Sequence, residues 1–570
     1  CYSAAELRIP NFPKMLFPKT TRPQGSTSGR ILMLSALFAI HLVGVFVEPS
    51  LFTREASAQG YRNPIINADV PDNTICRAGD YYYMISTTMH LMPGAPMMRS
   101  KDLKHWETVS YVFDRIEDGD RYNLVDGKTV YGQGQWAASL RHYFGKFYAW
   151  FTTNGEPYQG FLYTADKAEG PWKLVSRPPH FHDGSFFIDD DGRVYIFYNS
   201  GEAVELTRAI LDETGKTWGQ EAVLRRFSIP VRDGIENALL EGNNMMKING
   251  RYYLLMISWP RDNVRREVCY RAESLDGPWE KKIILNHALP PFPTGGVAQG
   301  GIVDSPTGEW YGIFFQDRNG VGRTPCLLPC RWEDGWPVLG NAEGKVPDDT
   351  SAKYIHQTGI LGNDEFSSDR LSLYWQWNHN PVNEAWSLTE RHGYLRMKTS
   401  RVVDNLFVAP NTITQRMEGP KCVGTVCLDI SKMQDGDKCG LSAFCGTSGV
   451  LCISRNGKSS VLSMEVQNIE LDKQHTVSKV RVEQKAKVRI PGTKRPVYLR
   501  VYGDFTNGRD IATFAYSLDG KNFIPIGSDM KMIFDGNTFF MGTKFAIFNY
   551  ATKQKGGYID IDWFHIDHEG

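Results

Sequence analysis

Gly79-Asp80-Tyr81-Tyr82-Tyr83 is the first of five copies of one pattern, a glycine followed closely by aromatic and alternating apolar residues. The copies recur at intervals of about 50 to 65 residues. Runs such as Val194-Tyr195-Ile196-Phe197-Tyr198 are rich in β-branched and aromatic residues, which is typical of strands. Five copies of a short-strand unit predict a five-bladed β-propeller. The later copies begin at Gly145, Gly192, Gly250 and Gly308.

The repeat stops at about Val346, where Pro347-Asp348-Asp349 opens a polar linker. Beyond the linker, short strand-like runs such as Val497-Tyr498-Leu499 follow one another without a common period, which predicts a β-sandwich. We therefore expect an all-β chain with four parts. They are a targeting segment at 1–58, a propeller catalytic domain at 59–345, a linker at 346–361 and a sandwich accessory domain at 362–570.

Length, charge and cysteine content limit the possible domain number, partners and disulfide bonds. A chain of 570 residues is too long for one ordinary core, in agreement with two domains. Its 64 Lys and Arg balance its 64 Asp and Glu, so we expect no nucleic-acid partner. Of the ten cysteines, five lie between Cys422 and Cys452. This odd local number argues against a full disulfide framework, and we interpret most of them as small buried hydrophobic residues.

One segment is apolar enough to be a signal peptide or a membrane anchor. The run from Ile31 to Val47 follows Arg30 and precedes Ala56-Ser57-Ala58, the pattern of a secretory signal. Cleavage after Ala58 predicts a secreted or periplasmic protein with no membrane span in its mature chain. An uncleaved anchor is the alternative.

Acidic residues recur at one phase of the repeat. Because the innermost strand of every blade lines the propeller axis, residues at equivalent positions should meet there. The positions seven to nine residues before the repeat glycines are Asp72, Trp136, Asp183, Glu241 and Gln299. Three carboxylates around one cavity repel, which raises the proton affinity of at least one and separates acid from base. That arrangement indicates glycoside hydrolysis, whereas calcium ligands or turn formers are the structural alternative.

Motifs in both halves resemble one family. Pro71-Asp72-Asn73, Gln135-Trp136-Ala137 and Gly322-Arg323 in the first half, and Trp375-Gln376-Trp377 and Asp560-Ile561-Asp562 in the second, occur in this order. Together they are similar to glycoside hydrolase family 43, in the β-xylosidase and α-L-arabinofuranosidase group that carries an additional domain. The resemblance implies a five-bladed propeller followed by a concanavalin A-like β-sandwich.

The resemblance also implies roles for the three carboxylates. Asp72 corresponds to the general base, Glu241 to the general acid, and Asp183 to the carboxylate that orients Glu241 and keeps its proton affinity high. Members of the family invert the anomeric configuration. An inverting pair is separated by roughly 6.5–9.5 Å, which leaves room for a water.

Further residues are assigned to binding. By resemblance Arg323 contacts sugar hydroxyls, and we place Trp136, Gln299 and His90 in the same pocket. Met89-His90-Leu91-Met92 occupies the position where many relatives have an aromatic-rich segment. The sequence therefore does not predict which sugar the pocket prefers. We expect catalysis to need no cofactor. Glu365 and Asp562 resemble ligands of a structural calcium, with simple surface carboxylates as the alternative.

Three possible functions agree with the sequence to different degrees. The first is an exo-acting hydrolase that removes terminal xylose or arabinofuranose from xylo-oligosaccharide or arabinoxylan-type substrates. The second is a noncatalytic carbohydrate-binding protein, which would not need three axial acids. The third is a retaining propeller enzyme acting on fructosides, which fits poorly because Pro71-Asp72-Asn73-Thr74 lacks the expected Asn-Asp-Pro-Asn pattern.

Overall fold

The computed structural model describes residues 60–231, 239–260, 264–490 and 495–568. The predicted targeting segment at 1–58 lies outside these ranges. Within them, none of the helices has the length and apolar character needed to cross a membrane. The helices are short 3₁₀ turns: η1 (Asp120–Asn123), η2 (Val125–Gly127), η3 (Arg208–Leu211), η4 (Gln220–Ala222), η5 (Asn319–Val321), η6 (Asn383–Ala385), η7 (Leu406–Val408) and η8 (Thr506–Gly508).

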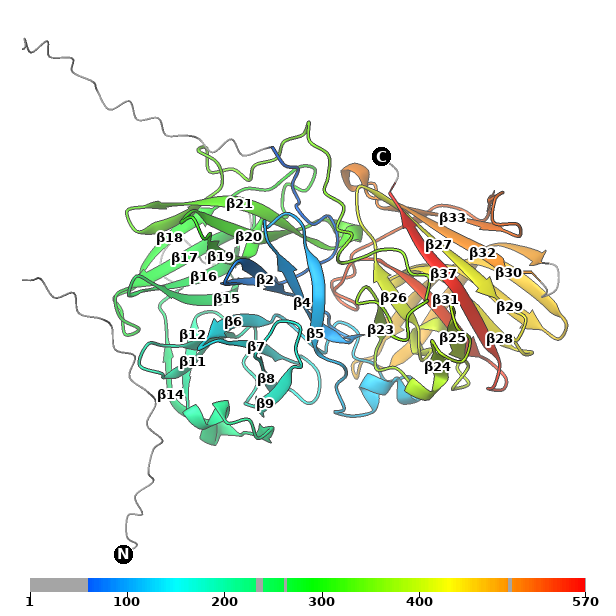
Figure 1. Ribbon diagram of the computed structural model, residues 1–570, viewed down its shortest axis with the longest axis horizontal. Helices are drawn as coiled ribbons and strands as arrows, with labels where there is room; N and C mark the ends of the chain where they lie inside the picture. Colours follow the sequence, from blue (N-terminus) through cyan, green and yellow to red (C-terminus); the bar gives the residue numbers. More distant parts are fainter. Residues whose placement is uncertain (1–59, 232–238, 261–263, 491–494, 569–570) are drawn as a thin grey trace, which may run out of the picture. The chain divides into compact units, whose positions relative to one another are not determined.

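Five separate sheets form the first domain, drawn in blue to green in Figure 1. The first contains β1 (Thr74–Ala78), β2 (Tyr81–Ile85), β4 (Gly94–Ser100) and β5 (Glu107–Phe113). The second contains β6 (Ser139–Tyr143), β7 (Lys146–Thr152), β8 (Gly160–Ala165), β9 (Lys173–Arg177) and β13 (Lys216–Thr217). The third contains β10 (Ser185–Ile188), β11 (Val194–Tyr198), β12 (Glu202–Leu206) and β14 (Val223–Ser228).

The last two sheets repeat the four-stranded plan. The fourth contains β15 (Leu239–Ile248), β16 (Arg251–Trp259), β17 (Arg266–Ala272) and β18 (Glu280–Leu285). The fifth contains β19 (Ala298–Asp304), β20 (Trp310–Asp317), β21 (Arg323–Glu333) and β22 (Trp336–Leu339). Strands β1, β6, β10, β15 and β19 contact one another in this order, and β19 returns to β1. This closed ring confirms the predicted five-bladed propeller.

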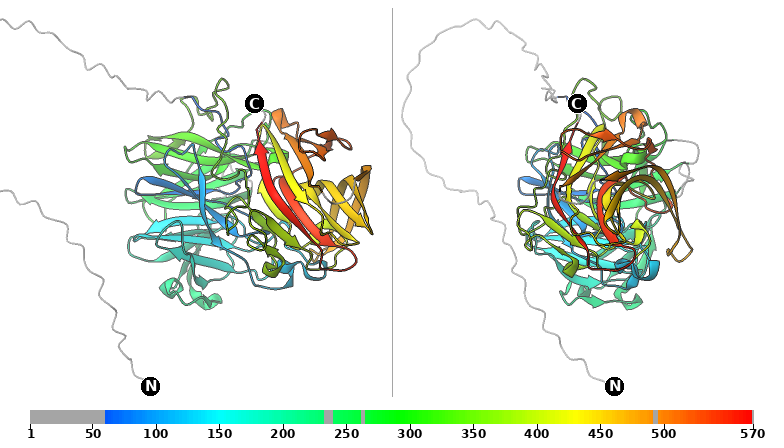
Figure 2. Two further views of the ribbon diagram at one scale, coloured as in Figure 1. Left: turned by 45° about the vertical axis from the view of Figure 1, so that its right-hand side comes forward. Right: turned by 90° about the vertical axis from the view of Figure 1, so that its right-hand side faces the viewer.

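The second domain is a sandwich of two eight-stranded sheets, shown in yellow to red in Figure 2. One sheet contains, besides the short β3 (Leu91–Met92), β23 (Gln376–Asn378), β26 (Ile413–Arg416), β28 (Asp437–Phe444), β29 (Thr447–Asn456), β30 (Ser459–Leu471), β31 (Val477–Ile490) and β36 (Lys544–Ala551). The other contains β24 (Trp386–Ser387), β25 (Leu395–Lys398), β27 (Lys421–Asp429), β32 (Val497–Asp504), β33 (Ile511–Ser517), β34 (Ile524–Pro525), β35 (Met530–Lys531) and β37 (Tyr558–Asp567).

One strand crosses the predicted domain boundary. Strand β3 belongs by sequence to the first repeat, yet it pairs with β23, so that Met92 lies opposite Trp377. The sandwich sheet therefore includes backbone from the propeller half of the chain, and this part of the chain is shared between the two domains.

The cysteines behave as small apolar residues. All nine that the structure describes are free thiols, and eight of them are buried. Burial raises the pKa of all nine thiols, that of Cys326 for example to about 12. They therefore fill core space and carry no disulfide framework among the described residues.

Candidate active site

The five residues at the common repeat phase lie at the start of the five innermost strands. Asp72, Trp136 and Asp183 stand two or three positions before β1, β6 and β10, and Glu241 and Gln299 lie within β15 and β19. Asp72, Asp183 and Gln299 line one water-sized cavity together with Gly242. The structure thus brings predicted residues from three blades to one place, beside the glycine that follows Glu241 in a fourth.

The backbone at these positions is unusual and repeats from blade to blade. Asp72, Asp183 and Gln299 have φ of +51°, +49° and +57°, a left-handed conformation that costs a non-glycine residue about 1–3 kcal/mol. The ladder registers of β15 and β19 slip at Glu241 and Gln299. Such bulges redirect side chains at the end of a strand, and here they aim polar groups at the propeller axis.

Asp72 is buried and paired. Its Oδ1 accepts a hydrogen bond from Arg323 Nη1 at 2.8 Å, and its Oδ2 accepts one from Thr87 Oγ1 at 2.7 Å. The side chains of Asp72 and Arg323 are only 7% and 5% exposed. A buried ion pair with a second hydrogen bond holds a carboxylate in one orientation. The Asp72 side chain is thereby fixed in position by Arg323 and Thr87.

Asp183 and Glu241 form the second half of the site. One carboxylate oxygen of each lies within 4.8 Å of the other and of a ring nitrogen of His182. Burial, together with the charge of Asp183, raises the pKa of Glu241 to about 7. Burial and the charge of Asp72 likewise raise the pKa of Asp183. The pair therefore retains a proton near neutral pH, beside the Asp72–Arg323 ion pair.

The buried Oδ1 of Asp183 has no hydrogen-bond partner within the described parts of the chain. Its nearest basic group is His182 Nε2 at 3.8 Å, too far for a hydrogen bond. A buried acceptor without a partner is rare in a finished fold and is satisfied by water or ligand. This atom marks a place where a substrate hydroxyl or a water is expected to bind.

Activity should fall as pH rises through about 7, because Glu241 then loses the proton that a general acid must donate. We expect kcat/KM on xylo-oligosaccharides to drop about tenfold per pH unit above that value. A pH profile measures this limb, and the control is an aryl glycoside whose leaving group needs no protonation. A flat profile from pH 6 to 9 on the oligosaccharide would contradict the assignment of Glu241 as the acid.

An aromatic pair next to the Asp72–Arg323 ion pair joins the two domains. The ring of Trp136 stacks on Phe540 of the sandwich, with centroids 5.5 Å apart and planes at 9°. The Phe540 backbone carbonyl accepts a hydrogen bond from Arg323 Nη2 at 3.2 Å, and the guanidinium lies over the Phe540 ring. Met89 and Leu91 pack nearby. Phe540 thus supplies an aromatic surface next to the segment that lacks the aromatic residues of many relatives.

Asp69 holds this pair in place. Its buried carboxylate accepts hydrogen bonds from the backbone N–H groups of Arg323 and Gly542 and pairs with Lys544 Nζ at 3.2 Å. The pKa of Asp69 is low because Lys544, Arg323 and these hydrogen bonds outweigh its burial. Neither Asp69 nor Phe540 was predicted, since nothing in the repeat pattern relates a sandwich loop to the propeller axis.

Replacing Phe540 with Ala should raise KM for xylo-oligosaccharides about 10- to 100-fold, because an aromatic wall of the pocket contributes roughly 1–3 kcal/mol. Steady-state kinetics measure the change. Ile533→Ala is the matched control, since this residue belongs to the same loop but is 49% exposed. Equal effects of both substitutions would assign Phe540 a purely structural role.

The remaining predicted binding residues, Gln299 and His90, lie in different surroundings. Gln299 packs against Gly242, where a Cβ would lie 2.7 Å from its side chain, so the glycine is required. The Gln299 backbone N–H donates to the buried Glu267 at 2.8 Å. His90, in contrast, is 2% exposed and packs against the rings of Tyr131, His379 and Phe539. The placement of His90 on the sugar-binding wall is therefore corrected: it is a buried interface residue.

The predicted calcium ligands do not converge. Glu365 pairs with His565, whereas Asp562 contacts Cys427 Sγ at 3.8 Å. Neither belongs to a group of three potential ligands in the ranges that the structure describes. The two acids, Asp562 within β37 and Glu365 paired with its His565, have different partners, and the structural calcium stays a prediction.

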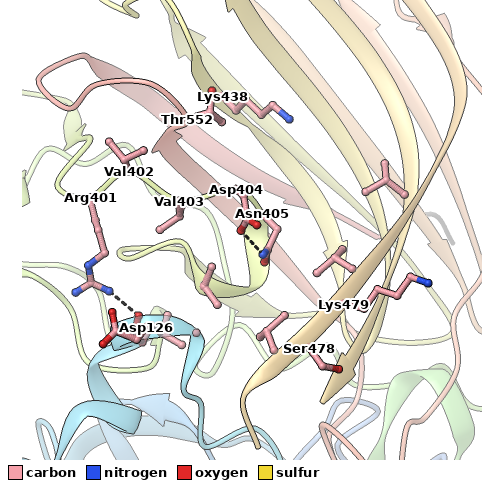
Figure 3. A pocket seen from close by; sticks show the side chains of 16 residues that line it. Asp126, Arg401, Val402, Val403, Asp404, Asn405, Lys438, Ser478, Lys479 and Thr552 are labelled. Atoms are coloured by element: carbon pink, nitrogen blue, oxygen red, sulfur yellow. Dashed lines mark hydrogen bonds between the residues drawn. The ribbon is translucent and has the colours of Figure 1, made fainter. Parts of the chain in front are cut away.

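A cavity of about 840 Å³ lies away from the carboxylates, between η2, η7 and β31 (Figure 3). Arg401, Asp126, Asp404 and Lys479 line it, and valines form most of its apolar surface. Its sixteen lining residues include no aromatic side chain on which a sugar ring could stack. None of the three axial carboxylates lines this larger cavity.

A propeller axis that places an arginine-paired carboxylate close to two carboxyl groups of raised pKa fits the acid–base chemistry of glycoside hydrolysis. The chain matches the sequence profile of glycosyl hydrolases family 43 over residues 61–337. Residues 363–567 match the beta xylosidase C-terminal concanavalin A-like domain. The chain belongs to glycosyl hydrolase family 43.

Similar proteins agree with this assignment. A putative beta-xylosidase of Xylanibacter ruminicola is 32% identical, over 83% of both chains. A non-reducing end alpha-L-arabinofuranosidase of Bacteroides ovatus is 31% identical over 62% of this chain and 68% of its own. The structure of a bifunctional GH43-CE protein of Bacteroides eggerthii has a TM-score of 0.80 and 37% identity, covering 90% of this chain and 64% of that one.

Proposed function

We propose that the chain is an inverting exo-glycoside hydrolase that releases terminal xylose, arabinofuranose or both from xylan-type hemicellulose oligosaccharides. The observation that carries this proposal is the contrast between Asp72, paired with Arg323, and the Asp183–Glu241 pair, whose pKa values are raised. The names of the two relatives, a beta-xylosidase and an alpha-L-arabinofuranosidase, support the two sugars. A noncatalytic binder would not need such a pair.

In this mechanism the terminal sugar lies beside Trp136 and Phe540. Glu241 donates its proton to the leaving glycosidic oxygen as the bond to the anomeric carbon breaks. Asp72 removes a proton from a water, whose hydroxyl adds to the opposite face of that carbon. Asp183 does not react; its negative charge disfavours ionisation of Glu241 and keeps the proton in place.

Proton NMR of the first-formed sugar tests the reaction. Purified protein should hydrolyse aryl β-D-xylosides, aryl α-L-arabinofuranosides or both, and release a monosaccharide of inverted configuration. From xylo-oligosaccharides it should release only single terminal units. First formation of the retained anomer, or binding of these sugars without turnover, would contradict the proposal.

The three carboxyl groups provide both the proton donor and the base, so the proposed reaction requires no cofactor. Chelation of divalent metals with EDTA should leave kcat unchanged within about twofold. A loss of kcat that added Ca²⁺ restores would contradict this and would assign a metal to the catalytic centre.

We also propose that the enzyme is exported, because polymeric xylan is found outside cells and the run from Ile31 to Val47 has the pattern of a secretion signal. Mass spectrometry of the protein recovered from an expressing culture should find it beginning after Ala58. An intact, membrane-bound N-terminal segment would support the anchor instead.

A further inference from the structure

Two histidines and a glutamate from three distant parts of the chain meet outside the active site. His356 comes from the linker, Glu418 from the segment just before β27, and His568 from the segment after β37. One nitrogen or oxygen atom of each lies within 4.8 Å of the others. Glu418 also forms a backbone bridge with Ala68. The cluster therefore lies where linker, sandwich and propeller meet.

The geometry directs both imidazoles to one carboxylate oxygen. His356 Nδ1 lies 2.9 Å and His568 Nε2 lies 2.7 Å from Glu418 Oε2. The other oxygen, Oε1, accepts the Gln357 backbone N–H at 3.0 Å, so it is already satisfied. The two rings stack with centroids 3.9 Å apart.

The ion pair with Glu418 does not satisfy the hydrogen-bonding capacity of the His568 ring. Its Nε2 is buried and makes no hydrogen bond of acceptable geometry, despite its short distance to Glu418. A buried ring nitrogen without a hydrogen bond is costly. A bound metal would take the place of this contact, because a ligating histidine presents a neutral nitrogen to the metal.

Two imidazoles and one carboxylate form a donor set suited to Zn²⁺. Ligand atoms about 2.0–2.1 Å from a tetrahedral zinc lie roughly 3.3 Å from one another. The observed 2.7 and 2.9 Å contacts require each histidine to move outward by only about half an ångström. Glu418 is 1% exposed and His356 is 36% exposed, so the site has a buried anion and an entry from solvent.

We propose that His356, Glu418 and His568 bind Zn²⁺, with a water as the fourth ligand. The ion would cross-link the linker, the start of β27 and the segment after β37. Because the cluster shares no residue with the group of His182, Asp183 and Glu241, we assign it a structural function. An ion bound only to the folded chain stabilises the fold by mass action.

Calorimetric titration of the full chain with Zn²⁺, after dialysis against a chelator, tests the site. We expect one ion per chain, and a melting temperature at least about 2 °C higher when zinc exceeds its dissociation constant 100-fold. His356→Gln combined with His568→Gln should weaken binding at least about 10-fold and abolish the shift. These positions are partly exposed, so the double variant should fold, whereas Glu418→Gln alters a buried group.

Two controls separate this site from others. His565→Gln removes a histidine that also contacts a glutamate but has no second imidazole, and it should leave zinc binding unchanged. His182→Gln tests the active-site group, in which a histidine and two acids also lie within 4.8 Å. Full zinc binding by the double variant, with loss in His182→Gln, would overturn the proposal, as would no binding at 0.1 mM zinc.

Discussion

Replacing Glu241 with Gln lowers kcat on xylo-oligosaccharides by about 10²- to 10⁴-fold, because glutamine keeps the shape of the acid but cannot donate its proton. This corresponds to roughly 3–5 kcal/mol of transition-state stabilisation. The loss should shrink on aryl glycosides with acidic leaving groups, which depart without protonation. Steady-state kinetics on a series of leaving groups measure both effects.

Glu273→Gln is the matched control for Glu241→Gln. Glu273 belongs to the same blade but is exposed and pairs with Arg251, so its replacement should leave kcat unchanged. Binding of xylose to the Glu241 variant, measured by calorimetry, shows whether the pocket is intact. Activity within about tenfold of the unaltered enzyme on the oligosaccharide would remove Glu241 from the role of acid.

The repeat made the axial residues predictable. In a propeller, equal phase in the sequence means equal height on the innermost strand, and Asp72, Asp183 and Glu241 occupy that height. Their left-handed or bulged backbone also follows from the repeat, since the turn-forming neighbours Gly184 and Gly242 recur at that phase. Periodicity thus carried information about spatial proximity between residues more than fifty positions apart.

Residues outside the repeat could not be placed in this way. Phe540 reaches the axis through a sandwich loop held by Asp69, a tertiary contact across more than 400 positions with no local signal. His90 has a polar side chain in a loop, yet its ring is buried because β3 pairs with the sandwich. The partners of Glu365 and Asp562, His565 and Cys427, are set by the packing around β37, which no local sequence pattern specifies.

Replacing Asp72 with Asn should lower kcat at least about 10³-fold on all substrates, because asparagine cannot accept the proton of the attacking water. It also leaves the buried Arg323 without the carboxylate that neutralises it. In contrast to Glu241→Gln, the loss should not shrink with a better leaving group, since water must still be activated. The two substitutions therefore separate base from acid by their dependence on the leaving group.

Asp80→Asn provides the comparison for Asp72→Asn, because it makes the same change in the exposed turn between β1 and β2 of the same blade. It should leave kcat unchanged. A melting curve of the Asp72 variant distinguishes loss of chemistry from loss of folding around Arg323. If the activity of a folded Asp72→Asn enzyme recovered as the leaving group improved, Asp72 would act on the departing oxygen instead. The two acids would then exchange roles, and water would approach the sugar from the side of Glu241.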